Sequence, residues 1–362
     1  MIAALTYKTE DKVKQMNDIC YFVSSMIRYI ALEFEETTYI PTSASEVFEC
    51  KYGDCKDKAT LLISLLKIID VEAYFVLISS IDRGQEIRDI PVFDQFSHAI
   101  VYIPEYDIWV DPTFPYAKIN ELPFQYQNRN AFVISDSVCE WFSTPIAEPH
   151  QNKTCNDIKI DIDDEGNAEI VIRETFTGLM ATLIRISYHA LPENYRETMF
   201  KSAVAAQFPK VTDVSIEFYG VDSIAQELSC STYVYSENFA KKSGDLLIFD
   251  MPFDNNVFFD PTISLAEREN PIYLPMRSET YVDAVICFAP KYKCVEKIEP
   301  MKLQTSFMES EITLDYNHGE IRISMYSKIF DNYIKKDQFD ELQELLEKSN
   351  KFRNDPIILK LK

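Results

Sequence analysis

Apolar residues in the first part of the chain recur with two different periods. From Asp11 to Phe34 they lie three or four positions apart, which predicts an amphipathic helix with Thr9 as its cap. From Thr60 to Val71 nearly every residue is apolar, which predicts a helix enclosed by its domain. Thr37 to Ser45 predicts a connecting loop, and Glu72 to Ser80 predicts a strand. Two helices followed by a sheet are therefore expected.

Two short apolar segments further along the chain predict an antiparallel hairpin. Phe96 to Ile103 and Ile108 to Asp111 are rich in residues that favour strands, and Pro104 to Asp107 between them has the composition of a turn. Ala131 to Ile134 predicts one more strand. The intervening loop from Ile81 to Phe93 precedes the hairpin, and we expect it to shape the specificity of any site there.

The second half of the chain alternates apolar and polar residues, which is typical of strands with one buried face. The pattern predicts two hairpins and three further strands, at residues 158–172, 310–326, 211–219, 228–235 and 246–249. Pro192 to Phe208 predicts a helix with proline in its first turn. A charged helix whose apolar stripe contains Phe339 and Leu342 is expected to close the chain.

Both periodicities break between Pro145 and Lys153, where proline and polar residues gather. We therefore expect an α+β domain at residues 1–148 and a β-rich, sandwich-like domain with a few helices at residues 149–362. The total length of 362 residues also exceeds what one hydrophobic core usually serves.

The composition is that of an ordinary globular protein, with 46% hydrophobic and 26% charged residues. The formal net charge of −22 argues against partners that are nucleic acids or anionic membranes. No apolar run reaches the length of a membrane span, so no membrane insertion is expected. The eight cysteines and four histidines show no zinc-ligand spacing, so we expect neither a metal nor another cofactor.

Cys55 is the first candidate for chemistry, because it opens the apolar helix directly after Gly53 and Asp54. Asp54 is a plausible N-cap. A thiol in the first turn of a helix is close to unpaired amides and to the positive end of the helix dipole, and both favour the nucleophilic thiolate. The predicted hairpin would place His98 and Asp111 on neighbouring strands, where the carboxylate can orient the imidazole. The set predicts a nucleophile, a base and an orienting residue.

Each of these residues also has a simpler interpretation when it is taken alone. A cysteine at a helix start is more often a small buried hydrophobe, a histidine in an apolar strand is more often a core residue, and an aspartate before proline is more often a turn former. Asp57 has two interpretations, a residue of the helix's first turn or a wall of the site. Cys50 is interpreted as a structural, half-buried cysteine rather than as a resolving thiol.

Two further features stay open in the sequence. The backbone N–H of Cys55 is one candidate oxyanion donor, and Tyr29 and Tyr39 are weaker candidates for a second. Trp109 is expected either in the core or on the wall of the cleft.

The segments YIPTSASEVFECKYGDCKDKATLLISLLKIIDVEAYFVLISS and FSHAIVYIPEYDIWVDPT resemble the transglutaminase-like superfamily, within the papain-like cysteine enzymes. The resemblance covers roughly the first 140 residues and is closest to a bacterial branch with a GDCKDKA core motif. It implies Cys55 as nucleophile, His98 as general base and Asp111 as the residue that orients His98. Ser97 stands where that branch often has asparagine.

The resemblance also carries expectations about context. It favours a bacterial periplasm or cell envelope. Relatives usually have a β-rich domain before the core, which leaves open whether this chain is a piece of a longer protein.

The sequence thus predicts a thiol-dependent acyl-transfer enzyme that acts on amide bonds of a protein or peptide, with hydrolysis favoured over cross-linking. The alternative is a non-catalytic protein that retains the fold and binds a peptide or another partner. The natural substrate, the oligomeric state and the role of the second domain are not specified by the residues.

Overall fold

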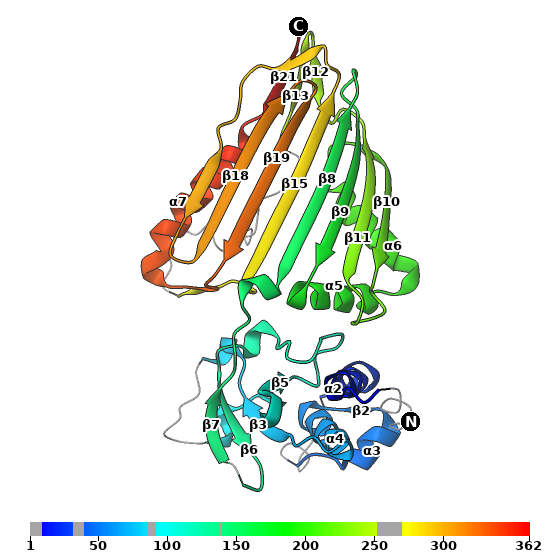
Figure 1. Cartoon of the computed structure of the whole chain (residues 1–362), viewed down its shortest axis with the longest axis vertical. Helices are drawn as coiled ribbons and strands as arrows, with labels where there is room; N and C mark the ends of the chain where they lie inside the picture. Colours follow the sequence, from blue (N-terminus) through cyan, green and yellow to red (C-terminus); the bar gives the residue numbers. More distant parts are fainter. Residues whose placement is uncertain (1–8, 32–39, 85–91, 138, 252–269) are drawn as a thin grey trace. The chain divides into compact units, whose positions relative to one another are not determined.

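The computed structural model describes residues 9–31, 40–84, 92–137, 139–251 and 270–362. The chain divides into two compact units, Met1–Ala147 with Thr182–Ile186, and Glu148–Ala181 with Ser187–Lys362. The fold class is mixed α+β, as predicted, with a helical and sheet-containing N-terminal region followed by a strand-rich region (Figure 1). Each unit is described by itself below.

The first helix of the N-terminal unit is shorter than its periodicity predicts. Helix α2 (Lys12–Tyr21) is capped by the side chain of Asp11 rather than by Thr9, and it continues into the π-helix η1 (Phe22–Met26). The predicted continuation to Phe34 is wrong, because β1 (Arg28–Tyr29) follows and pairs in parallel with β2 (Tyr52–Gly53). Backbone pairing with a distant strand therefore ends the helix, and residues 32–34 of the prediction lie outside the described residues.

Two helices lead into the predicted sheet. Helix α3 (Ala44–Cys50) was missed within a region taken as loop and lead-in, and Ser43 caps it by accepting a hydrogen bond from the amide of Glu46. It ends at Lys51, whose φ of 63° is left-handed. Helix α4 (Cys55–Ile68) is the predicted apolar helix, and seven of its residues are buried. Cys55, at the start of this helix, is half-buried.

The sheet of this unit contains the predicted hairpin. Its five antiparallel strands run in the order β5 (Ile108–Val110), β4 (His98–Ile103), β3 (Tyr74–Ile78), β6 (Asn130–Ile134) and β7 (Cys139–Ser143). One apolar cluster joins β4 to α2, α3 and α4. A second cluster contains Trp109, which is 3% exposed, so this tryptophan belongs to the core rather than to a cleft wall.

The C-terminal unit is built on one eight-stranded sheet, which Figure 1 shows as a row of long strands. The strands run in the order β10 (Val211–Tyr219), β11 (Leu228–Ser236), β9 (Ala168–Phe176), β8 (Lys153–Ile162), β15 (Ser278–Phe288), β19 (Glu320–Ile329), β18 (Met308–Asn317) and β17 (Met301–Gln304). Neighbours are antiparallel except for β8 and β15. The predicted hairpins β8–β9 and β18–β19 are confirmed.

A smaller sheet shares a hydrophobic core with the large one, which is the expected sandwich-like packing. Its strands run in the order β12 (Lys241–Ser243), β13 (Leu246–Phe249), β21 (Ile357–Leu361) and β16 (Tyr292–Cys294). A two-stranded ribbon is formed by β14 (Ile272–Tyr273) and β20 (Tyr333–Ile334). Because β21 follows the last helix, the prediction that a helix closes the chain is wrong.

Helix α6 (Glu193–Ala205) begins after Pro192 as predicted and packs on β10. Helix α5 (Gly178–Ala190), which contains Thr182–Ile186 of the first unit, was not predicted. Helix α7 (Phe339–Asn354) buries Phe339 and Leu342 against the β17–β19 end of the sheet. The predicted apolar stripe is therefore confirmed, and it explains why this charged helix is stable.

Candidate active site

Cys55 is the first residue of α4, and hydrogen bonds between its neighbours Asp54 and Asp57 fix the start of this helix. The carboxylate of Asp54 accepts hydrogen bonds from the amides of Lys56 and Asp57, at 3.1 and 3.2 Å. Asp57 returns the bond, because its Oδ2 accepts from the amide of Asp54 at 3.1 Å. This reciprocal capping box holds the first turn. The half-exposed thiol of Cys55 is thereby placed at the positive end of the helix.

Asp57 is explained by this capping role and by a second bond. Its Oδ1 accepts from the amide of Thr42 at 2.7 Å, and its side chain is buried. A Cβ on Gly53 would lie 2.7 Å from the Cβ of Asp57, so glycine lets the chain pass close to the helix start. Of the two sequence interpretations, these contacts support the first-turn role for Asp57.

His98 and Asp111 are joined by a hydrogen bond. His98 begins β4 and Asp111 directly follows β5, so the hairpin carries them side by side. The distance from His98 Nε2 to Asp111 Oδ2 is 3.0 Å, and the two side chains are 8% and 2% exposed. Since Nε2 is engaged in this way, Nδ1 is the nitrogen left for the thiol.

Charge governs the protonation of this pair. Burial alone would lower the pKa of His98, but the carboxylate of Asp111 and the neighbouring Cys55 outweigh it and raise that pKa to about 10. For Asp111 burial alone would raise the pKa, but His98 and Thr113 hold it below the usual value. Both shifts favour a charged imidazolium–carboxylate pair at neutral pH.

The thiol of Cys55 lies within hydrogen-bonding reach of the His98 side chain. The structure thus brings together all three residues that the sequence singled out, from the start of α4, the start of β4 and the end of β5. Thiol, imidazole and carboxylate in this order can form a thiolate–imidazolium pair with a fixed imidazole.

Three residues near this group were not recognised in the sequence as part of it. Thr113 donates to Asp111 Oδ1 from its backbone N–H and its hydroxyl, at 2.8 and 2.7 Å. The ring of Tyr126 is stacked on the imidazole of His98. Lys58 is 1% exposed, and its ammonium acts electrostatically on Asp111. The Asp-Pro-Thr sequence is a turn signal that could have indicated Thr113, but no local signal marks Tyr126.

Thr113→Val should weaken this arrangement without breaking it. The variant keeps the backbone donor and loses the hydroxyl, so the free energy of unfolding should fall by about 1–2 kcal/mol, with a few-fold slower reaction of Cys55 with iodoacetamide. The two tryptophans, Trp109 and Trp141, both lie in the N-terminal unit, so urea unfolding followed by their fluorescence reports on this unit.

Thr60→Val is the matched control for that experiment. The Thr60 hydroxyl donates to the carbonyl of Lys56 at 2.8 Å within α4, and not to Asp111. It should leave the reactivity of Cys55 unchanged. Equal reactivity of the Thr113 variant and the wild type would contradict the role given to the hydroxyl.

Tyr29 and Tyr39 are the candidates that the sequence offers for a second oxyanion donor. Tyr39 and the loop residues 85–91 lie outside the described residues. Tyr29 lies on β1 and is paired with Gly53, which brings it to the start of α4. The amide of Cys55 itself lies in the first turn, where amides lack an intrahelical acceptor.

Among the described residues, no group of three or more His, Cys, Asp or Glu side chains could hold a metal ion. In the same part of the chain, no helix has the length and apolar character of a membrane span. Cys50 is exposed rather than half-buried, and its Sγ is 3.3 Å from the carbonyl oxygen of Tyr52.

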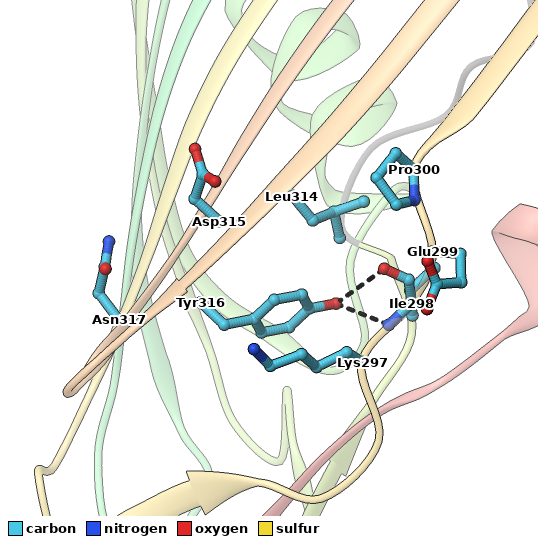
Figure 2. A pocket seen from close by; sticks show the side chains of 8 residues that line it. All are labelled: Lys297, Ile298, Glu299, Pro300, Leu314, Asp315, Tyr316 and Asn317. Carbon is cyan, nitrogen blue, oxygen red and sulfur yellow. Dashed lines mark hydrogen bonds between the residues drawn. The ribbon is translucent and has the colours of Figure 1, made fainter.

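A pocket in the C-terminal unit is lined by the segment Lys297–Pro300 and by the end of β18 (Figure 2). Its central side chain is Tyr316, whose hydroxyl accepts from the amide of Ile298 at 2.8 Å and faces the carbonyl of the same residue at 3.4 Å. The lining contains no nucleophile paired with a base. The hydroxyl of Tyr316 fastens a loop to the strand, which is a structural role.

Comparison with known proteins identifies a family for the N-terminal part of the chain. Residues 2–112 match the transglutaminase-like superfamily, and the chain therefore contains a transglutaminase-like domain at its N-terminal end. No curated protein matches the sequence.

Solved structures add a likeness of fold. A "putative protease" from Parabacteroides distasonis has a TM-score of 0.58 and 12% identity, covering 99% of this chain and 54% of its own. The chain thus spans about half the length of that protein. Baculovirus P35 has a TM-score of 0.13 and 8% identity, covering 57% of this chain and 96% of its own, which is too weak a likeness to support an inference.

Proposed function

We propose that this chain is a thiol-dependent acyl-transfer enzyme that acts on amide bonds of a protein or peptide. One observation carries the proposal: an imidazole bonded to a buried carboxylate lies within reach of a thiol at a helix N-terminus. Cys55 is the nucleophile, His98 the general base and acid, and Asp111 the residue that orients His98. The transglutaminase-like domain supports this assignment.

The reaction begins with attack of the Cys55 thiolate on the carbonyl carbon of the substrate amide. The negative charge moves to the carbonyl oxygen, where the amide of Cys55 is the candidate donor. His98 gives a proton to the leaving amine, the C–N bond breaks and a thioester remains. His98 then takes a proton from water, which attacks the thioester and releases the acid and the thiol.

Hydrolysis rather than cross-linking is the favoured outcome. The similar Parabacteroides structure is named a "putative protease", and this name supports hydrolysis over cross-linking. Water and a primary amine compete for the same thioester. Incorporation of a labelled primary amine into a peptide would identify cross-linking instead.

The first test is the pH dependence of Cys55 alkylation by iodoacetamide, read by mass spectrometry on the intact chain. Reaction at pH 6 should be fast, because the imidazolium stabilises the thiolate, and it should be lost in His98→Ala. Reaction like that of an ordinary cysteine, unaffected by His98, would favour the non-catalytic binding protein.

A peptide-library digest completes this test by asking for turnover itself. Cleavage by the wild type and none by Cys55→Ala is the expected result. Cleavage that survives Cys55→Ala would rule out the thiol mechanism.

A further inference from the structure

The imidazole of His98 has an aromatic ring stacked on it. The ring centroids of His98 and Tyr126 are 4.6 Å apart, and the ring planes differ by only 13°. A stacked arrangement this close is in the range where aromatic pairs attract each other. Because the carboxylate of Asp111 engages one edge of the imidazole, the stacking ring adds a restraint from a different direction.

Tyr126 is held in this place by its own backbone. Tyr126 is the last residue of the 3₁₀ turn η6 (Phe124–Tyr126). Its backbone amide donates a hydrogen bond to the carbonyl of Pro123 at 3.0 Å. Its own carbonyl accepts from the hydroxyl of Thr144 at 2.7 Å, which anchors the turn to the chain beyond β7. The ring is half-buried. These contacts hold the turn without help from a substrate, so the stack is built into the protein.

The charges around this stack favour a protonated imidazole. The face of an aromatic ring is electron-rich and attracts a cation that lies over it. Burial raises the pKa of the Tyr126 hydroxyl, and the nearby Asp111 and Cys55 raise it further, so its ring is neutral at physiological pH. Asp111 and Cys55 are the titratable groups that act on both His98 and Tyr126. Lys58 interacts with Asp111, and Tyr29 and Asp82 act on Tyr126.

We infer that Tyr126 is a positioning residue of the proposed enzyme: its ring holds the imidazole of His98 between Cys55 and Asp111 and stabilises the imidazolium form. This inference rests on the proposed function, because it concerns the same thiol–imidazole pair. The ring carries the role, and the hydroxyl does not.

Two substitutions separate the ring from the hydroxyl. Tyr126→Phe keeps the stacked ring, and its rate of Cys55 alkylation at pH 6 should stay within about twofold of the wild type. Tyr126→Leu removes the ring, and the rate at pH 6 should fall about tenfold. At pH 9 the two variants should converge, because an ordinary thiol ionises there without help from an imidazolium.

A merely structural tyrosine would give a different result. Phe142→Leu is the matched control, since Phe142 packs on Tyr102 and Trp109 in the same unit. It should lower the urea midpoint without changing the pH profile of alkylation. If Tyr126→Leu does not fold, Tyr126→Met replaces it as the ringless variant, with the same expected profile.

The outcomes distinguish this inference from the function on which it rests. A wild type whose alkylation at pH 6 needs His98, together with a ringless variant that reacts equally fast, would overturn the role of Tyr126 alone. A Tyr126→Phe variant as slow as Tyr126→Leu would also overturn it, because the hydroxyl would then be responsible. A wild type without any dependence on His98 would overturn the proposed function itself.

Discussion

Asp111→Asn is expected to lower the alkylation rate of Cys55 at pH 6 by on the order of 10³-fold. Thr113 directs two donors at Oδ1, so the new side chain should keep its oxygen there and turn its –NH₂ toward His98. Nε2 must then accept a hydrogen bond, and the proton of the neutral imidazole moves to Nδ1. That tautomer cannot take a proton from the thiol.

The carboxylate also supplies the charge that keeps His98 protonated. The pKa of His98 is raised from 6.5 to about 10 although burial acts in the opposite direction, and Asp111 is the largest of the causes that raise it. Without that negative charge, the pKa of His98 should fall, because burial then opposes the charged form with less compensation. The imidazolium would then be scarce at neutral pH, which is why a near-isosteric change should have so large an effect.

Iodoacetamide labelling of the intact chain at pH 6, followed by mass spectrometry, measures this effect. Asp107→Asn is the matched control, because Asp107 lies in the turn of the same hairpin and bonds the hydroxyl of Tyr102. It should react as the wild type does. A wild-type rate in Asp111→Asn would show that the carboxylate does not orient or charge His98.

The position of the site could be predicted from the sequence because its signals are local. The capping residues before α4 are encoded within a few positions of Cys55, and the hairpin that carries His98 and Asp111 is defined by two apolar segments and the turn between them. Helix caps and hairpin turns depend on neighbouring residues, which a single sequence contains.

The residues that support the site, such as Tyr126, are placed by packing between distant segments, and the sequence therefore contains little signal for them. Tyr126 stacks on a histidine 28 positions earlier because a 3₁₀ turn brings it there. The end of the first helix was missed for a similar reason. Its apolar period continues beyond Ile27, but pairing of Arg28 and Tyr29 with β2 converts the chain to a strand. Tertiary contacts can override local propensity, and periodicity carries no record of them.

Lys58→Met is expected to lower the free energy of unfolding of the N-terminal unit by about 3 kcal/mol at pH 7. The ammonium of Lys58 donates to the carbonyls of Ser24 and Ile27, at 3.1 and 2.7 Å, where η1 ends. Methionine fills a similar volume but leaves both buried carbonyls without this donor. It also removes the positive charge that acts on Asp111.

The lowered pKa of Lys58 makes the stability effect of Lys58→Met depend on pH. Burial lowers the pKa of Lys58 from 10.5 to about 8, although Asp111 acts to raise it. Between these two values the unfolded chain binds more protons at Lys58 than the folded chain, so this group makes stability rise with pH. His98 acts in the opposite direction between 6.5 and about 10, but it is present in both proteins. The stability difference between wild type and Lys58→Met should therefore grow as pH rises from 7 to 9.5.

Urea unfolding followed by tryptophan fluorescence at pH 7 and pH 9.5 tests both parts. Lys67→Met is the matched control, because Lys67 is exposed on the same helix, and its effect should stay within about 0.5 kcal/mol. A similarly small effect of Lys58→Met would mean that the two carbonyls gain little from the ammonium. A large effect that does not grow with pH would support the hydrogen bonds of Lys58 to the two carbonyls but would contradict its lowered pKa. The expected combination, a large effect that grows, would make Lys58 the buried cation that ties the helix of Cys55 to the segment leading to Tyr29.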